Sequence, residues 1–240
     1  MALAIARDVV VEFPVYGRRQ QSLKRSVLRA ATGGILATDA RDHVVIRALD
    51  KVSFELAEGD RVALIGHNGS GKSTLLRVLA GAYEPVSGSI RVEGSVASML
   101  SITLGLDMEA TGYENIFMRA ALMGLSQART RDLVDDICDF AELGDYIQMP
   151  MRTYSSGMLM RLAFAISTSV SSDILLMDEW LSVGDANFSE KAGRRLKSRV
   201  DDAKIMVLAS HDMGLVQRSC NRFITLEHGL IVSDSSSFPT

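Results

Sequence analysis

Eight residues between an apolar run and a helical pattern have the glycine spacing of a loop that holds phosphate. They are Gly66-His-Asn-Gly-Ser-Gly-Lys-Ser73 and fit G-x-x-x-x-G-K-[ST]. The glycines let successive backbone N–H groups point at phosphate oxygens, and the following helix adds its positive N-terminal end. We expect Lys72 to reach the β- and γ-phosphates and the Ser73 hydroxyl to ligate Mg²⁺. The predicted nucleotide contacts are Gly66, Asn68, Gly69, Ser70, Gly71, Lys72, Ser73 and Thr74.

Two adjacent acids follow an apolar run later in the chain. Ile174–Met177 reads as a buried strand that leads into Asp178 and Glu179. We expect Asp178 to lie at the carboxyl edge of the sheet, beside the glycine-rich loop, and to hold Mg²⁺ through water. Glu179 would polarise the attacking water. Because no guanine-reading N-K-x-D motif is present, these residues predict hydrolysis of ATP with Mg²⁺.

The elements around these motifs alternate between strands and helices. Short apolar runs such as Arg61–Ile65 and Ile205–Ala209 have the length of buried strands, and 110–170 is mostly helical in pattern. Thr111 and Glu114 have the spacing of a capping box. The alternation predicts an α/β fold with a largely parallel sheet between helices. Further expected elements are strands at 3–13 and 48–57, a turn at 58–60, a helix at Ser73–Ala80 and a frayed tail from Ser233.

Composition restricts the class of protein. The chain has 240 residues, 47% of them hydrophobic, and a net charge of −3, which disfavours a basic protein that coats nucleic acid. Cys138 and Cys220 match no CxxC or zinc spacing, so we expect two reduced, partly buried thiols. The N-terminus lacks the basic segment of a signal peptide, and no apolar run approaches the ~20 residues that span a bilayer. We therefore expect a soluble protein whose membrane role comes through a partner.

A third loop makes the pattern specific. Tyr154-Ser-Ser-Gly-Met158 precedes the helical run Leu159–Ser169 and lies shortly before the acidic strand. A loop of small residues at a helix N-terminus offers backbone N–H groups and a hydroxyl to an anion. At this position it resembles a variant of the signature of ABC (ATP-binding cassette) proteins, usually L-S-G-G-Q. The resemblance implies that Ser155, Ser156 and Gly157 face the γ-phosphate bound by the opposite subunit.

Later segments agree with the ABC family in type and order. Ser182-Val-Gly-Asp185 resembles the D-loop, whose Asp185 would cross the dimer interface, and His211, after the strand at 205–209, resembles the switch histidine that contacts the γ-phosphate. In the family an aromatic ring at the end of the first strand stacks on adenine. Phe13 and Tyr16 are the candidates here, and the alternative that both rings only pack locally stays open.

One departure from the family concerns the Q-loop, whose glutamine senses Mg²⁺ and the attacking water. No Gln occurs between Gly88 and Arg119, which leaves open how a partner's movement is coupled to hydrolysis.

The resemblance implies an architecture and a set of partners. The fold would be a P-loop NTPase (RecA-like) core with an antiparallel β subdomain and an inserted α-helical subdomain, together one nucleotide-binding domain over 1–240. Two copies would bind ATP head to tail and drive a membrane-spanning permease from the cytoplasmic face of the inner membrane, without nucleic acid. The expected bounds are a core at roughly 1–100 and 172–240, a helical subdomain at roughly 105–170 and a basic insertion at 17–47.

The segment Thr111-Gly-Tyr-Glu-Asn-Ile116 and the variant signature together resemble ATPases that export O-antigen, capsule or teichoic acid. The long insertion before Ala48 also fits that branch, and the polymer stays open. The alternatives are an ATPase of an importer or of a drug or lipid exporter, and a non-transport ABC ATPase. A normal Q-loop glutamine and signature would favour an importer or a drug or lipid exporter. Two cassettes or long coiled coils would favour a non-transport ABC ATPase.

The insertion carries five basic residues before any acid. Leu23 and Val27 lie on one face of a helix there, which suggests an amphipathic helix near the membrane surface or near the phosphates of a lipid-linked substrate. A solvated surface excursion is the alternative. The basic residues are Arg18, Arg19, Lys24, Arg25 and Arg29.

Overall fold

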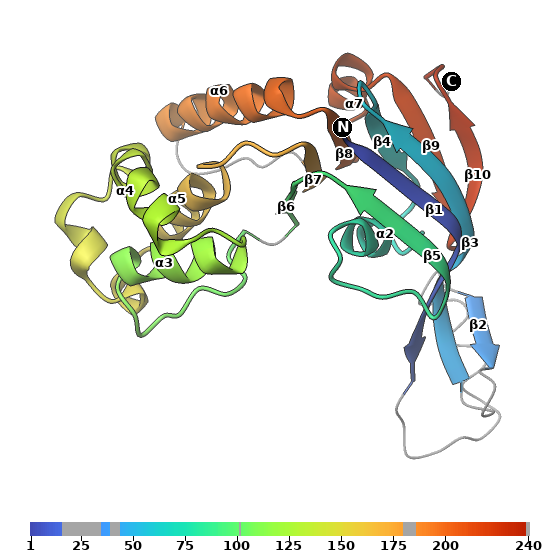
Figure 1. Ribbon diagram of the computed structural model, residues 1–240, viewed down its shortest axis with the longest axis horizontal. Helices are drawn as coiled ribbons and strands as arrows, with labels where there is room; N and C mark the ends of the chain where they lie inside the picture. The colour runs from blue at the N-terminus through green and yellow to red at the C-terminus, as the bar shows by residue number, and fades with distance from the viewer. Residues whose placement is uncertain (16–34, 39–43, 101, 180–185, 239–240) are drawn as a thin grey trace. The chain divides into compact units, whose positions relative to one another are not determined.

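The computed structural model describes residues 1–15, 35–38, 44–100, 102–179 and 186–238. The chain forms two compact units, drawn in Figure 1. The first contains Met1–Val96, Leu176–Trp180 and Lys204–Thr240, and the second contains Ala97–Leu175 and Leu181–Ala203. Most of the basic insertion, together with Tyr16 and Asp185, lies outside the described residues.

An antiparallel sheet occupies the first unit. Its strand order is β2-β3-β1-β5, and β1 pairs antiparallel with both β3 and β5 (Figure 1). Alternate residues of β1 and β3, such as Ala4, Ala6, Phe54 and Leu56, are buried, which is the period of a strand with one face on a core. The strands are β1 (Leu3–Pro14), β2 (Ile35–Thr38), β3 (Val44–Ala57) and β5 (Ser87–Glu93).

The second sheet carries the loops with the predicted motifs. Its strand order is β10-β9-β4-β8-β7-β6, and β4 pairs in parallel with both β8 and β9. Every residue of β8 is buried, as expected for a strand covered on both faces. The strands are β4 (Arg61–Ile65), β6 (Val96–Met99), β7 (Ile174–Asp178), β8 (Ile205–Ala209), β9 (Arg222–Glu227) and β10 (Leu230–Ser235).

The tail differs from the prediction. Ser233 and Ser235 belong to β10, which pairs antiparallel with β9, and Arg222 holds Asp234 with two hydrogen bonds at 2.8 and 2.7 Å. The expected frayed tail from Ser233 is therefore wrong for this part of the chain, because backbone pairing and an ion pair order a polar segment.

Among the described residues, the first unit contains two short helices. α2 (Lys72–Leu79) follows the glycine-rich loop directly, one residue earlier than expected, and buries Leu75, Leu76, Val78 and Leu79. α7 (Met213–Ser219) follows β8 and begins at the cap residue Asp212.

The second unit contains the longer helices. The predicted capping box starts α3 (Gly112–Leu122): Thr111 accepts from Glu114 N at 3.1 Å and Glu114 accepts from Thr111 N at 2.8 Å. Such a cap contributes about 0.5–2 kcal/mol to helix stability. The other helices are α4 (Gln127–Ala141), α5 (Ser156–Ser167) and α6 (Ala186–Asp202), with 3₁₀ turns η1 (Gly144–Gln148) and η2 (Met151–Thr153).

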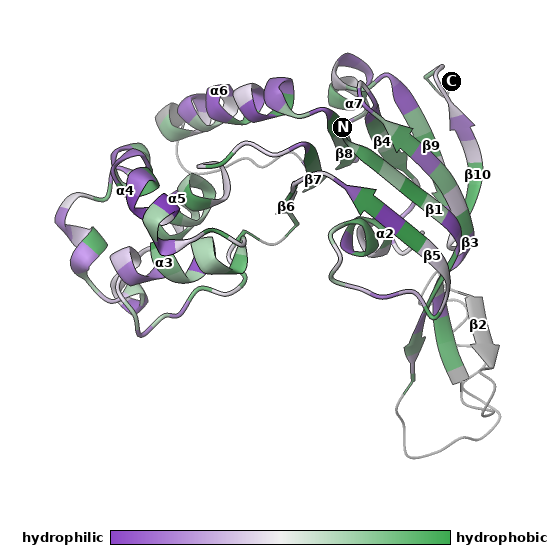
Figure 2. Cartoon of the chain, in the orientation of Figure 1, coloured by the Kyte–Doolittle hydropathy of each residue, from purple (hydrophilic) through white to green (hydrophobic). Residues whose placement is uncertain are grey.

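Helix α6 shows how this unit builds its core. Its residues are mostly hydrophilic (Figure 2), but Phe188, Ala192, Leu196 and Val200 recur every fourth position and are buried, so one stripe faces the interior. The Phe188 ring meets Phe140 and Phe164 at centroid distances of 5.4 and 6.4 Å. Within the described residues, no helix is both long and apolar enough to cross a membrane.

Candidate active site

The glycine-rich loop fits only because two of its residues have no side chain. A Cβ at Gly66, whose φ is 151°, would lie 2.2 Å from the carbonyl oxygen of Leu226 in β9. A Cβ at Gly71, whose φ is 110°, would lie 2.8 Å from the carbonyl oxygen of Ala48. Both contacts are with backbone, which cannot move aside as a flexible side chain would. The loop therefore packs directly on the strands beneath it.

Lys72 lies inside this loop. Its Nζ donates to the carbonyl oxygens of Gly66 at 2.6 Å and His67 at 3.0 Å, and the residue is only 8% exposed. Burial lowers the pKa of the Lys72 ammonium, while the charges of Asp178 and Glu179 oppose that shift. An anion entering the loop would compensate the desolvated ammonium.

Ser73 and Asp178 meet at the carboxyl end of β7. The Ser73 hydroxyl donates to Asp178 Oδ2 at 2.6 Å, across 105 residues of sequence. A hydroxyl beside a carboxylate is the hard oxygen set that Mg²⁺ prefers. These two residues, predicted from separate motifs, therefore fit the metal that a triphosphate site requires.

Glu179 has an uncommon backbone conformation. Its φ is +70°, a left-handed value that costs a non-glycine residue about 1–3 kcal/mol and occurs preferentially at functional sites. Its N–H donates to the carbonyl oxygen of Ala209, the last residue of β8, at 2.7 Å. The side chain is exposed, and this hydrogen bond holds the backbone of Glu179 at the end of β8.

His211 follows β8 in a loop built from local caps. The Ser210 hydroxyl accepts from Asp212 N at 3.1 Å, and Asp212 Oδ1 accepts from Leu215 N at 2.9 Å at the start of α7. The His211 side chain is exposed. Since β7 and β8 are neighbours in the sheet order, Glu179 and His211 follow adjacent strands.

The remaining predicted nucleotide contacts belong to the same loop. Asn68 and Gly69 are exposed, Thr74 is half-buried in α2, and Ser70 is fully buried. The Ser70 carbonyl accepts from Gly229 N in the β9–β10 turn at 3.0 Å, which ties the loop to that turn.

Ser155 caps a helix near the predicted place, but α5 begins at Ser156, three residues before the predicted run Leu159–Ser169, so Ser156 and Gly157 belong to its first turn. Ser155 Oγ accepts from Met158 N at 3.2 Å and caps α5. Ser155 and Ser156 are exposed. A Cβ at Gly157 would meet only Ser155 Oγ, at 3.8 Å, so the face above the first turn of α5 is open.

Phe13 has an aromatic neighbour that the sequence analysis missed. Its ring meets Tyr83 edge-on, with centroids 5.4 Å apart and planes at 72°, and the Arg77 guanidinium lies 5.8 Å from the Tyr83 ring centre. Tyr83 follows α2 with no pattern around it, so no signal in the sequence pointed to this pair.

The segment in the place of the Q-loop is held by two buried residues of α3. Asn115, with 0% exposure, accepts from Asp107 N at 2.8 Å and donates to Asp107 O at 2.9 Å. Arg119, 9% exposed, donates to Leu104 O and to Ser167 Oγ in α5. Burial lowers the pKa of the Arg119 guanidinium. The sequence analysis did not single out either residue.

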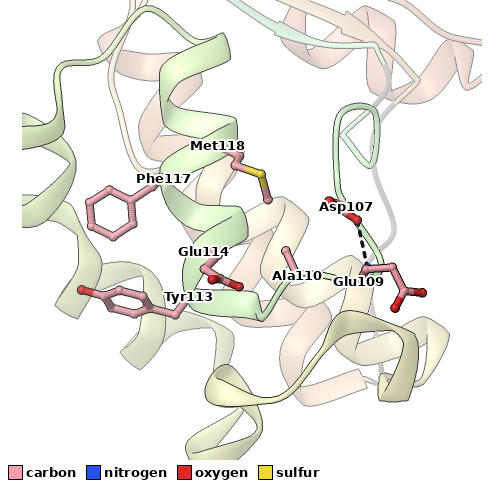
Figure 3. Close-up of a pocket in the computed structure, with 7 residues that line it drawn as sticks. All are labelled: Asp107, Glu109, Ala110, Tyr113, Glu114, Phe117 and Met118. Atoms are coloured by element: carbon pink, nitrogen blue, oxygen red, sulfur yellow. Dashed lines mark hydrogen bonds between the residues drawn. The ribbon is translucent and has the colours of Figure 1, made fainter.

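An open hollow of 630 Å³ lies at the N-terminal half of α3. Figure 3 draws the Tyr113 and Phe117 rings beside one another on α3, and the carboxylates of Asp107 and Glu109 on the segment before it. The ring centroids are 5.3 Å apart. The lining residues are Asp107, Glu109, Ala110, Tyr113, Glu114, Phe117 and Met118, so acidic and apolar groups share one surface.

The family model described as "ABC transporter" matches residues 49–182, more than half of the chain. The chain belongs to the ABC transporter family. The resemblance drawn from the signature and the predicted fold class are thereby confirmed, and as an ABC ATPase the chain binds and hydrolyses ATP.

Individual relatives of this ABC protein agree. It is 47% identical to the O-antigen export system ATP-binding protein RfbE of Yersinia enterocolitica over 98% of both chains. It is 41% identical to the teichoic acids export ATP-binding protein TagH of Listeria innocua, over 94% of this chain and 64% of that one. The structure of the ATP-binding cassette MJ0796 as a dimer bound to ADP and Pi has a similar fold, with a TM-score of 0.68 at 20% identity over 97% of both chains.

Proposed function

We propose that this chain is the ATP-hydrolysing subunit of an exporter that carries a cell-surface polysaccharide across the cytoplasmic membrane. The 47% identity to an O-antigen export ATPase, over almost the whole length of both chains, carries this proposal. The similarity to a teichoic acid export ATPase supports the same branch. Both names describe polymers of the cell surface, so the proposal covers that class and leaves the particular polymer open.

We assign the residues around the glycine-rich loop to ATP. Lys72 would leave the carbonyls of Gly66 and His67 for the β- and γ-phosphates, because a phosphate oxygen is a stronger acceptor for a desolvated ammonium than a neutral carbonyl. Ser73 and Asp178 would hold Mg²⁺, which offsets phosphate charge when bound. The pair Phe13 and Tyr83, with Tyr16 as the alternative, is our candidate for the adenine contact.

Hydrolysis itself requires a positioned water. We assign that role to Glu179, whose strained backbone is fixed to the end of β8, with His211 contacting the γ-phosphate from the adjacent strand. Positioning and charge stabilisation then supply most of the catalysis, as in other phosphoryl transfers.

A second copy would complete the site. The exposed N-terminus of α5, with Ser155, Ser156 and Gly157, presents N–H groups and a hydroxyl to an anion. We propose that two chains associate head to tail, each covering the other's ATP with this loop, and that Asp185 lies at the shared interface.

The export proposal is tested in cells that lack the chain. Wild-type protein should restore polymer on the cell surface, and Lys72→Met should leave the lipid-linked polymer inside. Restored export of a different substrate class with no effect on surface polymer would instead favour the alternative, an ATPase of an importer or of a drug or lipid exporter. Co-purification with DNA or ribosomes would favour a non-transport ABC ATPase.

We further propose that the hollow on α3 contacts the membrane-spanning partner at the cytoplasmic membrane face. Its acids would complement a basic segment, and its apolar side chains, Tyr113 at 37% exposure with the half-buried Phe117 and Met118, offer area to an amphipathic helix. Tyr113→Ala with Phe117→Ala should abolish co-purification of the partner while ATP binding persists. The control is Tyr146→Ala, a ring of the same unit that is 53% exposed and lies outside the hollow. Equal co-purification of both variants would contradict the contact.

A further inference from the structure

Two histidine rings lie together beside the glycine-rich loop. His67 is the second residue of that loop, and His228 lies in the turn between β9 and β10. Their ring centroids are 5.0 Å apart, with the planes tilted by 57°. Both side chains are exposed, and neither histidine has a role in the assignments to ATP made above.

The tautomer of His67 follows from its hydrogen bond. Nδ1 lies 2.8 Å from the carbonyl oxygen of Asn68. A carbonyl only accepts, so Nδ1 carries the proton of the neutral ring and Nε2 keeps its lone pair. A backbone carbonyl holding one ring nitrogen while the other keeps its lone pair is the usual arrangement of a histidine that ligates a metal.

The spacing of the rings suits one shared metal ion. With Zn–N bonds of about 2.0–2.1 Å and a nitrogen about 1.1 Å from the ring centre, two imidazoles at a tetrahedral ion have centroids about 5 Å apart. The observed separation is 5.0 Å. We propose that His67 and His228 form a two-histidine site for a divalent transition metal such as Zn²⁺, with water completing the coordination.

Backbone contacts between the glycine-rich loop and the β9–β10 turn hold the two histidines near each other. Gly229 N donates to Ser70 O at 3.0 Å, and a Cβ at Gly229 would lie 2.8 Å from Ala48 O, so the turn is seated against the loop. His228 has a φ of +49° in this tight turn. Backbone contacts thus hold the loop and the turn that carry the two rings side by side.

Its ligands differ in kind from the oxygen pair Ser73–Asp178. Imidazole nitrogens favour Zn²⁺, Cu²⁺ and Ni²⁺ over Mg²⁺, so the nucleotide's own metal would not occupy it. The pair would supply two protein ligands, and because both side chains are exposed, water would take the remaining coordination positions.

Metal at this site would act on nucleotide binding. The carbonyl of His67 accepts from Lys72 Nζ at 3.0 Å, so chelation of the His67 ring fixes the loop in the arrangement that keeps Lys72 on its own backbone. Zn²⁺ is therefore expected to raise the KM for ATP in wild-type protein and to do so less in His228→Asn. Zn²⁺ also binds ATP in solution, but it does so equally in both assays. The difference between the two proteins therefore reports the effect of Zn²⁺ on the protein.

The direct test is calorimetric titration of the nucleotide-free full chain with ZnCl₂. Wild-type protein should bind one ion at this site, and His67→Gln and His228→Asn should each weaken that binding by more than about tenfold, since loss of an outer-shell partner alone costs about 10–100-fold. Asn at 228 tolerates the positive φ. His211→Gln, which removes another exposed histidine, should bind as wild type does.

Unchanged zinc binding in both variants, or no binding by the wild type, would overturn the site and show that the two rings only pack against each other. A measurement on wild-type protein covers the case in which a variant fails to fold. The chain has four histidines, and Zn²⁺ should shift the imidazole ¹H resonances of two of them together. A shift of one histidine alone, or of none, would also refute the pair.

Discussion

Replacing Gly66 by Ala tests whether close backbone contact shapes the glycine-rich loop. The new Cβ would lie 2.2 Å from Leu226 O and 2.6 Å from Ser70 Oγ, so the loop must move away from β9. The φ of 151° costs about 1–3 kcal/mol for a residue with a side chain, and the overpacking adds about 1–3 kcal/mol.

Gly59→Ala is the matched control. Gly59 also has a positive φ, 97°, but a Cβ there meets nothing within 4 Å. The two variants share the conformational cost and differ in the clash. For a chain of this length 1 kcal/mol shifts Tm by about 2–4 °C, so Gly66→Ala should melt about 2–12 °C below Gly59→Ala.

Affinity for ATP should separate the two variants further. Moving the loop misaligns the N–H groups that face phosphate, and each lost charge-assisted hydrogen bond costs about 1.5–3 kcal/mol, or at least about tenfold in Kd. Equilibrium titration with a fluorescent ATP analogue, together with thermal unfolding, measures both effects. If Gly66→Ala matched Gly59→Ala in Tm and in affinity, the packing argument would be refuted.

Three more outcomes follow from single groups. Lys72→Met should weaken ATP binding by about 10–150-fold, from the loss of charge-assisted bonds worth about 1.5–3 kcal/mol, and near-normal titration would contradict the role of the ammonium. Asn115→Ala should lower the free energy of unfolding by about 2–4 kcal/mol and remove the hydrogen-exchange protection of the Asp107 amide. Retained protection would show that other contacts hold the segment before α3. Burial raises the pKa of the Cys220 thiol to about 12, so at pH 8 only about one molecule in 10⁴ is thiolate. Iodoacetamide should therefore label Cys220 far more slowly in native than in unfolded protein, as measured by mass spectrometry. Equal labelling rates would exclude a protected thiol.

The strand–loop–helix units were predictable because their chemistry is local. β4 and β8 have the predicted bounds, Arg61–Ile65 and Ile205–Ala209, since runs of four and five apolar residues between polar turns have the length of buried strands and are too short for helices. The capping box at Thr111 was equally predictable, because both of its residues lie within one turn of helix. The meeting of Ser73 and Asp178 required only that two strands end at the same edge of a sheet.

What the sequence did not reveal depends on contacts between distant or ordinary residues. Asn115 and Arg119 look like unremarkable polar positions of α3, and only the fold shows that they hold the carbonyls of the preceding segment. β10 is ordered by its pairing with β9 and by the ion pair between Arg222 and Asp234, which no local pattern indicates. The His67–His228 pair joins a loop and a turn 161 residues apart, which spacing motifs do not detect.

The most direct measurement is light scattering coupled to size exclusion, on Glu179→Gln protein with and without Mg²⁺ and ATP. Because the variant should bind ATP but not activate water, two copies should stay closed around two nucleotides, so the mass should double only when ATP is present. Adding Ser155→Trp at the open cap of α5 should return the mass to that of a single chain. A variant that holds ATP yet remains a single chain, or one that hydrolyses ATP at the wild-type rate, would contradict the account.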